Sequence, residues 1–260
     1  MPETDLSLLL RAAEGAGDVA LRFAGPSARV WDKPGGAGPV TEADLAVNAH
    51  LLDILRAARP EYGWLSEETE DDQARLSADT VFIVDPIDGT RSFIEGGRTW
   101  AHSIAVAHKG LITAGVVFLP MRGMMYAAAQ SGGATLNGAL LKASRLARLD
   151  DGNFLAAKPM MEPRFWSGQV PDFTRGYRPS LAYRLALVGQ GRFDGMITFR
   201  PTWEWDVAAG SLIAQQAGAQ VADRAGAPLR FNQPDPRTHG IITAAPDVHS
   251  ELIRRHIPDA

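Results

Sequence analysis

The stretch FIVDPIDGTRSF, residues 82–93, decides how this sequence is interpreted. It begins as a short apolar run typical of a buried strand. It then contains Asp85 and Asp88, three residues apart, followed directly by Gly89 and Thr90. Asp-Pro and Asp-Gly are common turn dipeptides, because proline fixes φ and glycine accepts a positive φ. A turn alone would explain the stretch, so its function depends on what the rest of the chain supplies.

The amino-acid composition excludes several classes of protein. The chain has 260 residues, 45% of them hydrophobic, which is enough to bury a large core. Lys and Arg number 26 against 30 Asp and Glu, so a net charge of -4 provides no general basic field for a nucleic-acid polymer or an anionic membrane. The lack of cysteine excludes disulfides, thiolate nucleophiles and Cys-ligated zinc. Acids precede the first apolar run and no run reaches the length of a membrane span, so we expect a cytoplasmic protein.

Residues 1–147 are expected to form an N-terminal α+β half. Apolar spacing predicts helices near 6–23 and 41–59, and residues 25–38, rich in glycine and proline, are expected to be a loop. Short strand-like runs separated by turns follow, which predicts an antiparallel sheet behind the two helices.

Residues 148–260 are expected to form a C-terminal α/β half that completes the site. Strand-like runs alternate there with helices predicted at 181–188 and 207–217. We expect the two halves to pack as one functional unit.

Further acidic residues lie at the ends of apolar runs. Glu67 and Glu68 end one such run, and Asp206 opens a predicted helix. Each has an ordinary explanation, as a solvated strand end or as a helix N-terminal acid favoured by the dipole. Asp44 lies three residues after Thr41, where a capping box needs an acid.

Four of these carboxylates together match the needs of a hard cation. Mg2+ prefers several carboxylate and carbonyl oxygens, and paired ions promote phosphate ester hydrolysis by clamping the attacking and leaving oxygens. The backbone amides of Gly89 and Thr90, at the start of a predicted short helix, would cradle a phosphate. The four carboxylates are Glu67, Asp85, Asp88 and Asp206.

The chain resembles the inositol monophosphatase superfamily of Mg2+-dependent phosphatases. It carries SEE at 66–68, DPIDGT at 85–90 and WDVAAG at 205–210, in the family's order, with Ser66 where glycine is usual. The resemblance covers nearly the whole chain. It implies a five-layered α-β-α-β-α sandwich of the α+β or α/β class, a lithium-sensitive phosphomonoesterase and a homodimer.

The resemblance also implies a site with two or three Mg2+ ions. Glu67, Asp85 and the backbone carbonyl of Ile87 would hold the first ion. Asp85 would bridge to the second, which Asp88 and Asp206 would complete.

Roles in catalysis and in substrate binding follow from the same resemblance. Asp44, through Thr90, would orient and deprotonate a water activated by the metal, with Glu67 as the third catalytic residue. Lys33 matches a lysine on the family's mobile loop. The attack is direct, without a covalent phosphoenzyme. The expected substrate contacts are Asp88, Gly89, Thr90, Arg200 and Asp206.

The identity of the substrate, a small-molecule phosphate ester, is the part of the prediction that the sequence constrains least. PTWEWD at 201–206 and PSLAYRLALVGQG at 179–191 resemble the 3'(2'),5'-bisphosphate nucleotidase branch. Phe199 and Arg200 stand where inositol-type members carry a glutamate, and an arginine would suit a second phosphate. We rank the bisphosphate nucleotidase first. The alternatives are inositol-1-monophosphatase and histidinol-phosphate phosphatase, whose motif DPIDGTRSFI also fits.

Two hypotheses outside this class remain open. A haloacid-dehalogenase phosphatase needs two aspartates two residues apart, whereas Asp85 and Asp88 are three apart. A noncatalytic sensor of metal or phosphate would be expected to lose ligands, and the motifs retain them.

Overall fold

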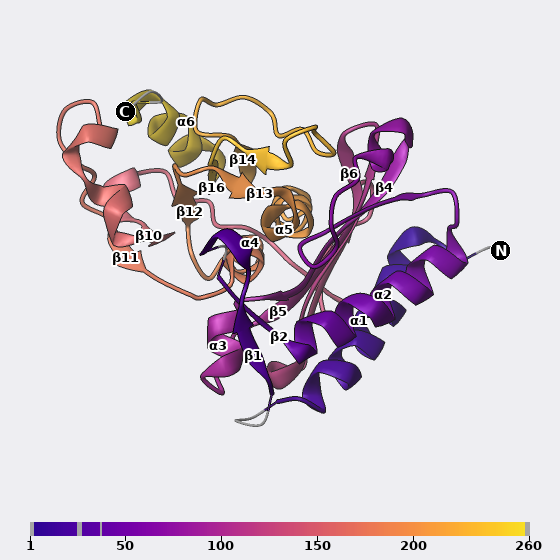
Figure 1. Cartoon of the computed structure of the whole chain (residues 1–260). Helices are drawn as coiled ribbons and strands as arrows, with labels where there is room; N and C mark the ends of the chain where they lie inside the picture. Colours follow the sequence, from indigo (N-terminus) through magenta and orange to yellow (C-terminus); the bar gives the residue numbers. More distant parts are fainter. Residues whose placement is uncertain (1–2, 25–27, 37, 258–260) are drawn as a thin grey trace.

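The computed structural model describes residues 3–24, 28–36 and 38–257, and it arranges them in five layers (Figure 1). Helices α1 and α2 cover one face of a larger sheet, and α4 and α5 cover its other face. A smaller sheet packs against α4 and α5, and α6 lies on that sheet's outer side. This order confirms the predicted α-β-α-β-α sandwich. The helices are α1 (Asp5–Leu21), α2 (Glu42–Ala58), α3 (Thr90–Ile94), α4 (Leu181–Gly189), α5 (Glu204–Gln216) and α6 (Pro246–Arg255).

Local capping explains where α2 begins. The Thr41 side chain accepts hydrogen bonds from the Ala43 and Asp44 amides, and the Asp44 side chain accepts one from the Thr41 amide. This reciprocal pair is the predicted capping box. Helix α5 begins at Glu204, three residues before the predicted start, so Asp206 lies within its first turn.

The larger sheet has seven strands in the described residues, in the order β3-β4-β5-β6-β7-β8-β9. They are β3 (Gly63–Ser66), β4 (Thr80–Asp88), β5 (Ala101–His108), β6 (Leu111–Leu119), β7 (Met124–Ala129), β8 (Gly133–Leu136) and β9 (Ala139–Leu140). Neighbours pair antiparallel except β3 and β4, which are parallel, so the predicted purely antiparallel sheet is wrong for that pair. Residues 67–79 provide the long crossover that a parallel pair requires, where a hairpin would have given an antiparallel one.

Strand β4 carries a β-bulge at the DPID sequence. Asp85 pairs with Ser103 and Asp88 pairs with Ala101, so two residues of β4 face a single residue of β5. In a regular strand, residues three apart point to opposite faces. The extra residue changes that alternation and lets both aspartates face the same site. Proline is tolerated in a bulge because it has no amide to donate.

The smaller sheet has the order β11-β10-β12-β16-β14. Its strands are β10 (Asn153–Ala156), β11 (Thr174–Gly176), β12 (Gly195–Thr198), β14 (Gln220–Ala222) and β16 (Ile241–Ala244). The predicted boundary at residue 147 falls between β9 and β10, and the division of the chain into two units at that point stays a prediction.

Small residues let α5 pack closely between the sheets. A Cβ on Gly210 would come within 2.7 Å of the Leu185 Cβ in α4. A Cβ on Gly115 of β6 would come within 2.9 Å of the Ala209 Cα. The small residues Ala209 and Gly210 of WDVAAG therefore let α5 pack closely against β6 and α4.

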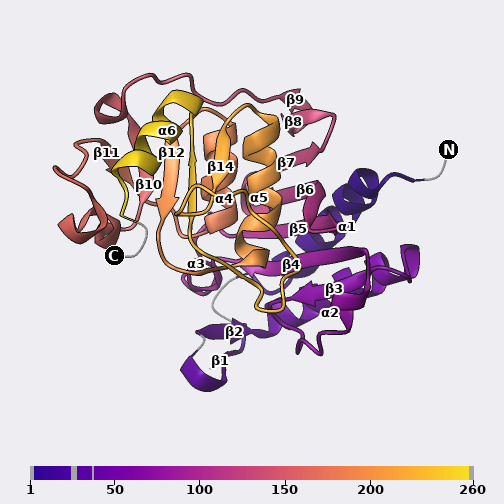
Figure 2. The same cartoon turned by 90° about the horizontal axis from the view of Figure 1, so that it is seen from above.

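The glycine-rich segment before α2 contains more structure than predicted. Strands β1 (Val30–Asp32) and β2 (Pro39–Thr41) pair antiparallel and lie at the edge of the molecule near α2 (Figure 2). Residues 25–27 and 37 of the predicted loop lie outside the described residues. A further short pair joins β13 (Thr202–Trp203) to β15 (Arg237–Thr238). In the described part of the chain, no helix combines the length and apolar character needed to cross a membrane.

Candidate metal and phosphate site

Three aspartates meet where β4 ends and α5 begins. Asp85 and Asp88 come from the bulge of β4, and Asp206 comes from the first turn of α5. One carboxylate oxygen from each lies within 4.8 Å of the other two. The structure therefore brings together three of the four carboxylates that the sequence selected as metal ligands.

The surroundings of this group favour a bound cation. Asp85 is buried, and its Oδ1 has no hydrogen-bond partner among the described residues. Burial, followed by the charges of Glu67 and Asp88, raises the pKa of Asp85 well above its ordinary value. Burial and the charge of Asp88 likewise raise the pKa of Asp206. Clustered buried carboxylates are costly unless they are paired, and an all-oxygen donor set of this kind fits Mg2+.

Asp88 is also anchored to the start of α4. Its Oδ2 accepts hydrogen bonds from the Ser180 Oγ at 2.6 Å and from the Ala182 amide at 2.7 Å. Ser180 in turn caps α4 by accepting from the Tyr183 amide at 3.0 Å. Burial raises the pKa of Asp88 to about 6 despite these donors. One oxygen of Asp88 is thus held by the protein, while the other can face a metal.

Ser180 is a positioning residue that the site prediction did not include. Its signals in the sequence are a serine before a predicted helix, which is an ordinary capping pattern, and its place in the motif PSLAYRLALVGQG.

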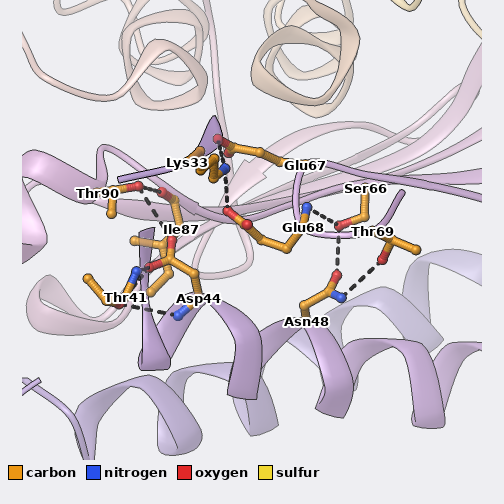
Figure 3. A network of polar contacts seen from close by, with 10 residues as sticks. All are labelled: Lys33, Thr41, Asp44, Asn48, Ser66, Glu67, Glu68, Thr69, Ile87 and Thr90. Carbon is orange, nitrogen blue, oxygen red and sulfur yellow. Dashed lines mark hydrogen bonds and ion pairs between the residues drawn. The ribbon is translucent and has the colours of Figure 1, made fainter. Parts of the chain in front are cut away.

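Glu67 and Glu68 are held together by Lys33 (Figure 3). The Lys33 Nζ lies 2.7 Å from Oε1 of each glutamate. Burial raises the pKa of Glu68 to about 7. Glu67 is not among the three aspartates that converge within 4.8 Å, although its charge raises the pKa of Asp85. Glu67 therefore lies near the three aspartates but outside their group, and its role as a metal ligand stays a prediction.

Asp44 serves the helix cap and contacts Thr90 as well (Figure 3). Its Oδ2 accepts from the Thr41 amide at 2.8 Å and from the Thr41 Oγ1 at 2.5 Å. The Thr90 Oγ1 lies 3.4 Å from the Asp44 Oδ1 and 3.1 Å from the Ile87 carbonyl oxygen. A hydroxyl has one proton, so Thr90 donates mainly to one of these two acceptors at a time. Burial raises the pKa of Asp44 to about 6.

Gly89 and Thr90 form the expected turn into a short helix. Gly89 precedes α3 with a φ of 99°, a conformation that other residues rarely adopt. Both residues line a cavity of about 230 Å³ that Glu67 also borders. A phosphate could be held there by backbone N–H groups.

A larger cavity of about 590 Å³ borders Asp88 and Asp206. Arg200 is exposed and lines it, and its role as a substrate contact stays a prediction. Phe199 is buried and stacks on His256 with ring centroids 3.8 Å apart, so it packs away from the cavity. Of the two residues that replace the usual glutamate, only Arg200 is placed to meet a substrate.

Comparisons with known proteins identify the family of this chain. Residues 2–260 match the family model described as the inositol monophosphatase family. The chain is 33% identical over 234 residues to the Nus factor SuhB of Escherichia coli, covering 85% of each chain. It is 35% identical over 207 residues to an inositol-1-monophosphatase of Rhizobium meliloti, covering 74% of each chain.

Solved structures have the same fold. The extragenic suppressor protein suhB of Bartonella henselae is 30% identical and superposes with a TM-score of 0.81, covering 95% of this chain and 96% of that one. An IMPase of Thermotoga maritima is 26% identical with a TM-score of 0.82, covering 96% and 95%. The chain therefore belongs to the inositol monophosphatase family, whose members are Mg2+-dependent phosphatases that hydrolyse phosphate monoesters.

Proposed function

We propose that this chain hydrolyses the phosphate monoester of a small polyhydroxylated compound, with inositol 1-phosphate as its reference substrate. The Rhizobium meliloti relative, named an inositol-1-monophosphatase, supports that alternative better than the bisphosphate nucleotidase ranked first from the sequence. The observation that carries the proposal is the convergence of Asp85, Asp88 and Asp206, one oxygen from each within 4.8 Å of the others.

Mg2+ would be held by the three aspartates, with Glu67 and the Ile87 carbonyl as further ligands. When bound, it supplies positive charge that stabilises the attacking and leaving oxygens. The unpartnered Oδ1 of Asp85 and the wholly oxygen donor set fit such an ion.

The remaining residues bind the phosphate and move a proton. The amides of Gly89 and Thr90 would donate to the nonbridging phosphate oxygens. The Thr90 hydroxyl would orient the attacking water, and Asp44 would accept the proton through Thr90. A pKa of about 6 leaves Asp44 mostly ionised at neutral pH yet basic enough for that role. No group of the protein needs to bond to phosphorus.

A substrate panel tests the proposal. We would measure kcat/KM with Mg2+ for inositol 1-phosphate, histidinol phosphate and adenosine 3',5'-bisphosphate. We expect Mg2+-dependent turnover with inositol 1-phosphate well above histidinol phosphate. Full activity in excess chelator would contradict the metal mechanism. Turnover of histidinol phosphate alone would contradict the choice of inositol 1-phosphate as the reference substrate.

Three further properties stay predictions: inhibition by lithium and a homodimer, both implied by the family resemblance, and a cytoplasmic location, expected from the acids before the first apolar run. Adding Li+ to the same assay tests the first. Light scattering of the purified protein tests the second, and cell fractionation tests the third.

A further inference from the structure

His102 is the single residue of β5 that lies opposite the bulge of β4. The two aspartates of the bulge pair with Ser103 and Ala101, so only His102 faces the two residues between them. The His102 side chain is fully buried, and its Nδ1 forms a hydrogen bond with the Pro86 carbonyl oxygen. A carbonyl oxygen can only accept, so Nδ1 carries the ring proton and donates it to the bulge.

The His102 ring lies in apolar surroundings, where an imidazole is a costly occupant. The centre of the ring is 5.5 Å from that of Trp100 and 6.2 Å from that of Phe118. Burial lowers the pKa of His102 to about 4, so the ring is neutral at neutral pH. Its Nε2 has no hydrogen-bond partner among the described residues. Burying an unpartnered polar atom costs stability, so packing alone would favour an apolar side chain at this position.

The Pro86 carbonyl lies where the regular pairing of β4 and β5 is interrupted. Proline has no amide, and a bulge disrupts the ladder of backbone hydrogen bonds. A side-chain donor from β5 therefore holds the first residue of the bulge against the neighbouring strand. Pro86 directly follows Asp85 and stands two residues before Asp88. The hydrogen bond from His102 thus restrains the backbone from which both carboxylates project.

Ser103 makes a corresponding contact on the opposite face of β5. Successive side chains of a strand point to opposite faces. The Ser103 side chain is fully buried, and its Oγ donates to the Trp205 carbonyl oxygen at 2.8 Å. Trp205 immediately precedes Asp206 in the first turn of α5. Two adjacent residues of β5 therefore hold the backbone beside all three aspartates, one through the bulge and the other through α5.

We propose that His102 and Ser103 are positioning residues that set the distances between Asp85, Asp88 and Asp206, and thereby the affinity of the site for Mg2+. This inference rests on the proposed function, because that function assigns Mg2+ to the three aspartates. Neither residue needs to contact the ion. Mg2+ demands near-ideal octahedral geometry, so its affinity falls when its ligands shift.

Two substitutions of His102 test the contact with the bulge. Asn carries an amide N–H as many bonds from the backbone as the His Nδ1, whereas Leu has nearly the shape of Asn and no donor. Thermal melting with Mg2+ as the only added ligand gives the half-saturating Mg2+ concentration without any turnover. We expect His102→Leu to raise this concentration roughly tenfold, as the loss of a residue behind metal ligands typically does. His102→Asn should restore most of the affinity.

The matched control for His102→Leu is His256→Leu. His256 is also buried, and its Nδ1 also contacts a backbone carbonyl, that of Phe165, at 3.0 Å. It lies beyond α6, on the smaller sheet's side of the molecule. His256→Leu should lower the melting temperature and leave the half-saturating Mg2+ concentration unchanged.

Ser103→Ala tests the contact with α5, and it keeps the test valid if the His102 variants fail to fold. It removes the hydroxyl that donates to Trp205, so we expect a higher half-saturating Mg2+ concentration, as in His102→Leu. Its matched control is Ser211→Ala. Ser211 is buried further along α5, and its Oγ donates to the Ala208 carbonyl oxygen at 2.8 Å. That variant should bind Mg2+ like the wild type.

The possible results separate the positioning role from the proposed function. If the wild type binds Mg2+ and the folded variants of His102 and Ser103 bind it equally well, the positioning role is wrong and the proposed function stands. If His256→Leu weakens binding as much as His102→Leu, or His102→Asn binds no better than His102→Leu, the hydrogen bond to the bulge does not set the affinity. A wild type with neither an Mg2+-dependent melting shift nor Mg2+-dependent turnover would overturn the proposed function and the positioning role with it.

Discussion

Two acidic residues in the first turn of α5 have opposite environments. Glu204 is fully buried, and its carboxylate accepts from the Asn232 amide at 2.6 Å and the Gln233 amide at 3.0 Å. Asp206, two residues later, accepts no bond from an amide or a basic side chain in the described residues and instead faces Asp85 and Asp88. The Glu204 carboxylate receives two hydrogen bonds from backbone amides, whereas the Asp206 carboxylate lies beside two other carboxylates.

This contrast separates a structural acid from a candidate ligand. The Asn232 side chain accepts from the buried Arg75 at 2.6 Å, so Glu204 belongs to a network that joins α5 to the segments before β4 and before β15. Burial raises the pKa of Glu204 to about 7 even with its two amide donors. A buried acid whose two oxygens both receive donors therefore serves the fold, whereas an acid with an oxygen left free, as in Asp85, can hold a metal.

The largest expected effect is on activity, from Asp85→Asn. We expect kcat/KM to fall more than about a hundredfold, because even partners outside the ligand shell are typically worth 10- to 100-fold. Without metal, the melting temperature should stay the same or rise, since one buried negative charge is removed. Enzyme kinetics and thermal melting measure the two quantities. Asp79→Asn on the exposed surface is the control. Unfolding of Asp85→Asn would place Asp85 with Glu204 as a structural acid.

The reverse pattern is expected for Glu204→Gln. An amide side chain can accept from only one of the two backbone amides and repels the other, so we expect the free energy of unfolding to fall by about 2 to 3 kcal/mol. The kcat/KM of the folded fraction should change far less than in Asp85→Asn. Urea denaturation gives the first value and active-site titration normalises the second. Unchanged stability would remove the distinction between the two acids.

Binding of Mg2+ should depend on pH because the clustered aspartates of the site also bind protons. Burial raises the folded-state pKa of Asp88 to about 6, and it also raises the pKa values of Asp85 and Asp206 well above their ordinary range. The stabilising contribution of Asp88 is therefore complete below its ordinary pKa and is lost as pH rises through its folded-state pKa of about 6, and the raised pKa values of Asp85 and Asp206 act with the same sign. Mg2+ at about ten times its Kd should add roughly 1.4 kcal/mol, or about 3 to 6 °C in melting temperature, at pH 8. The gain should be smaller at pH 5, and an equal gain at both would contradict the linkage.

Asp44 combines the two environments. Its carboxylate accepts a hydrogen bond from the Thr41 amide, as a structural acid does, and it also contacts Thr90 in the candidate site. Thr41→Ala should cost about 1 kcal/mol of stability, as the loss of a cap usually does, and it should also lower kcat by freeing Asp44. Thr4→Ala removes the cap of α1 at a similar cost and should leave kcat unchanged. Equal kcat in both variants would make Asp44 a cap alone.

Features that depend on neighbouring residues could be predicted from the sequence. The capping box of Thr41 and Asp44, the turn at Gly89 and the α3 start follow from short-range backbone chemistry. The motif resemblance placed Asp85, Asp88 and Asp206 in one site before any geometry was known. What the motif did not reveal was the β-bulge, which allows aspartates three residues apart to serve the same site.

From the sequence by itself, the resemblance of the motifs SEE, DPIDGT and WDVAAG to the inositol monophosphatase superfamily determined the family, the expected five-layered fold and the acids that could bind a metal. Only the tertiary structure decided that β3 and β4 run parallel, that Glu204 is satisfied while Asp206 is not, and that Arg200 lines the cavity when Phe199 turns away from it. These outcomes depend on partners far along the chain. The desolvation of a charge, and the groups that offset it, are set by packing between layers, and no short stretch of sequence contains that information.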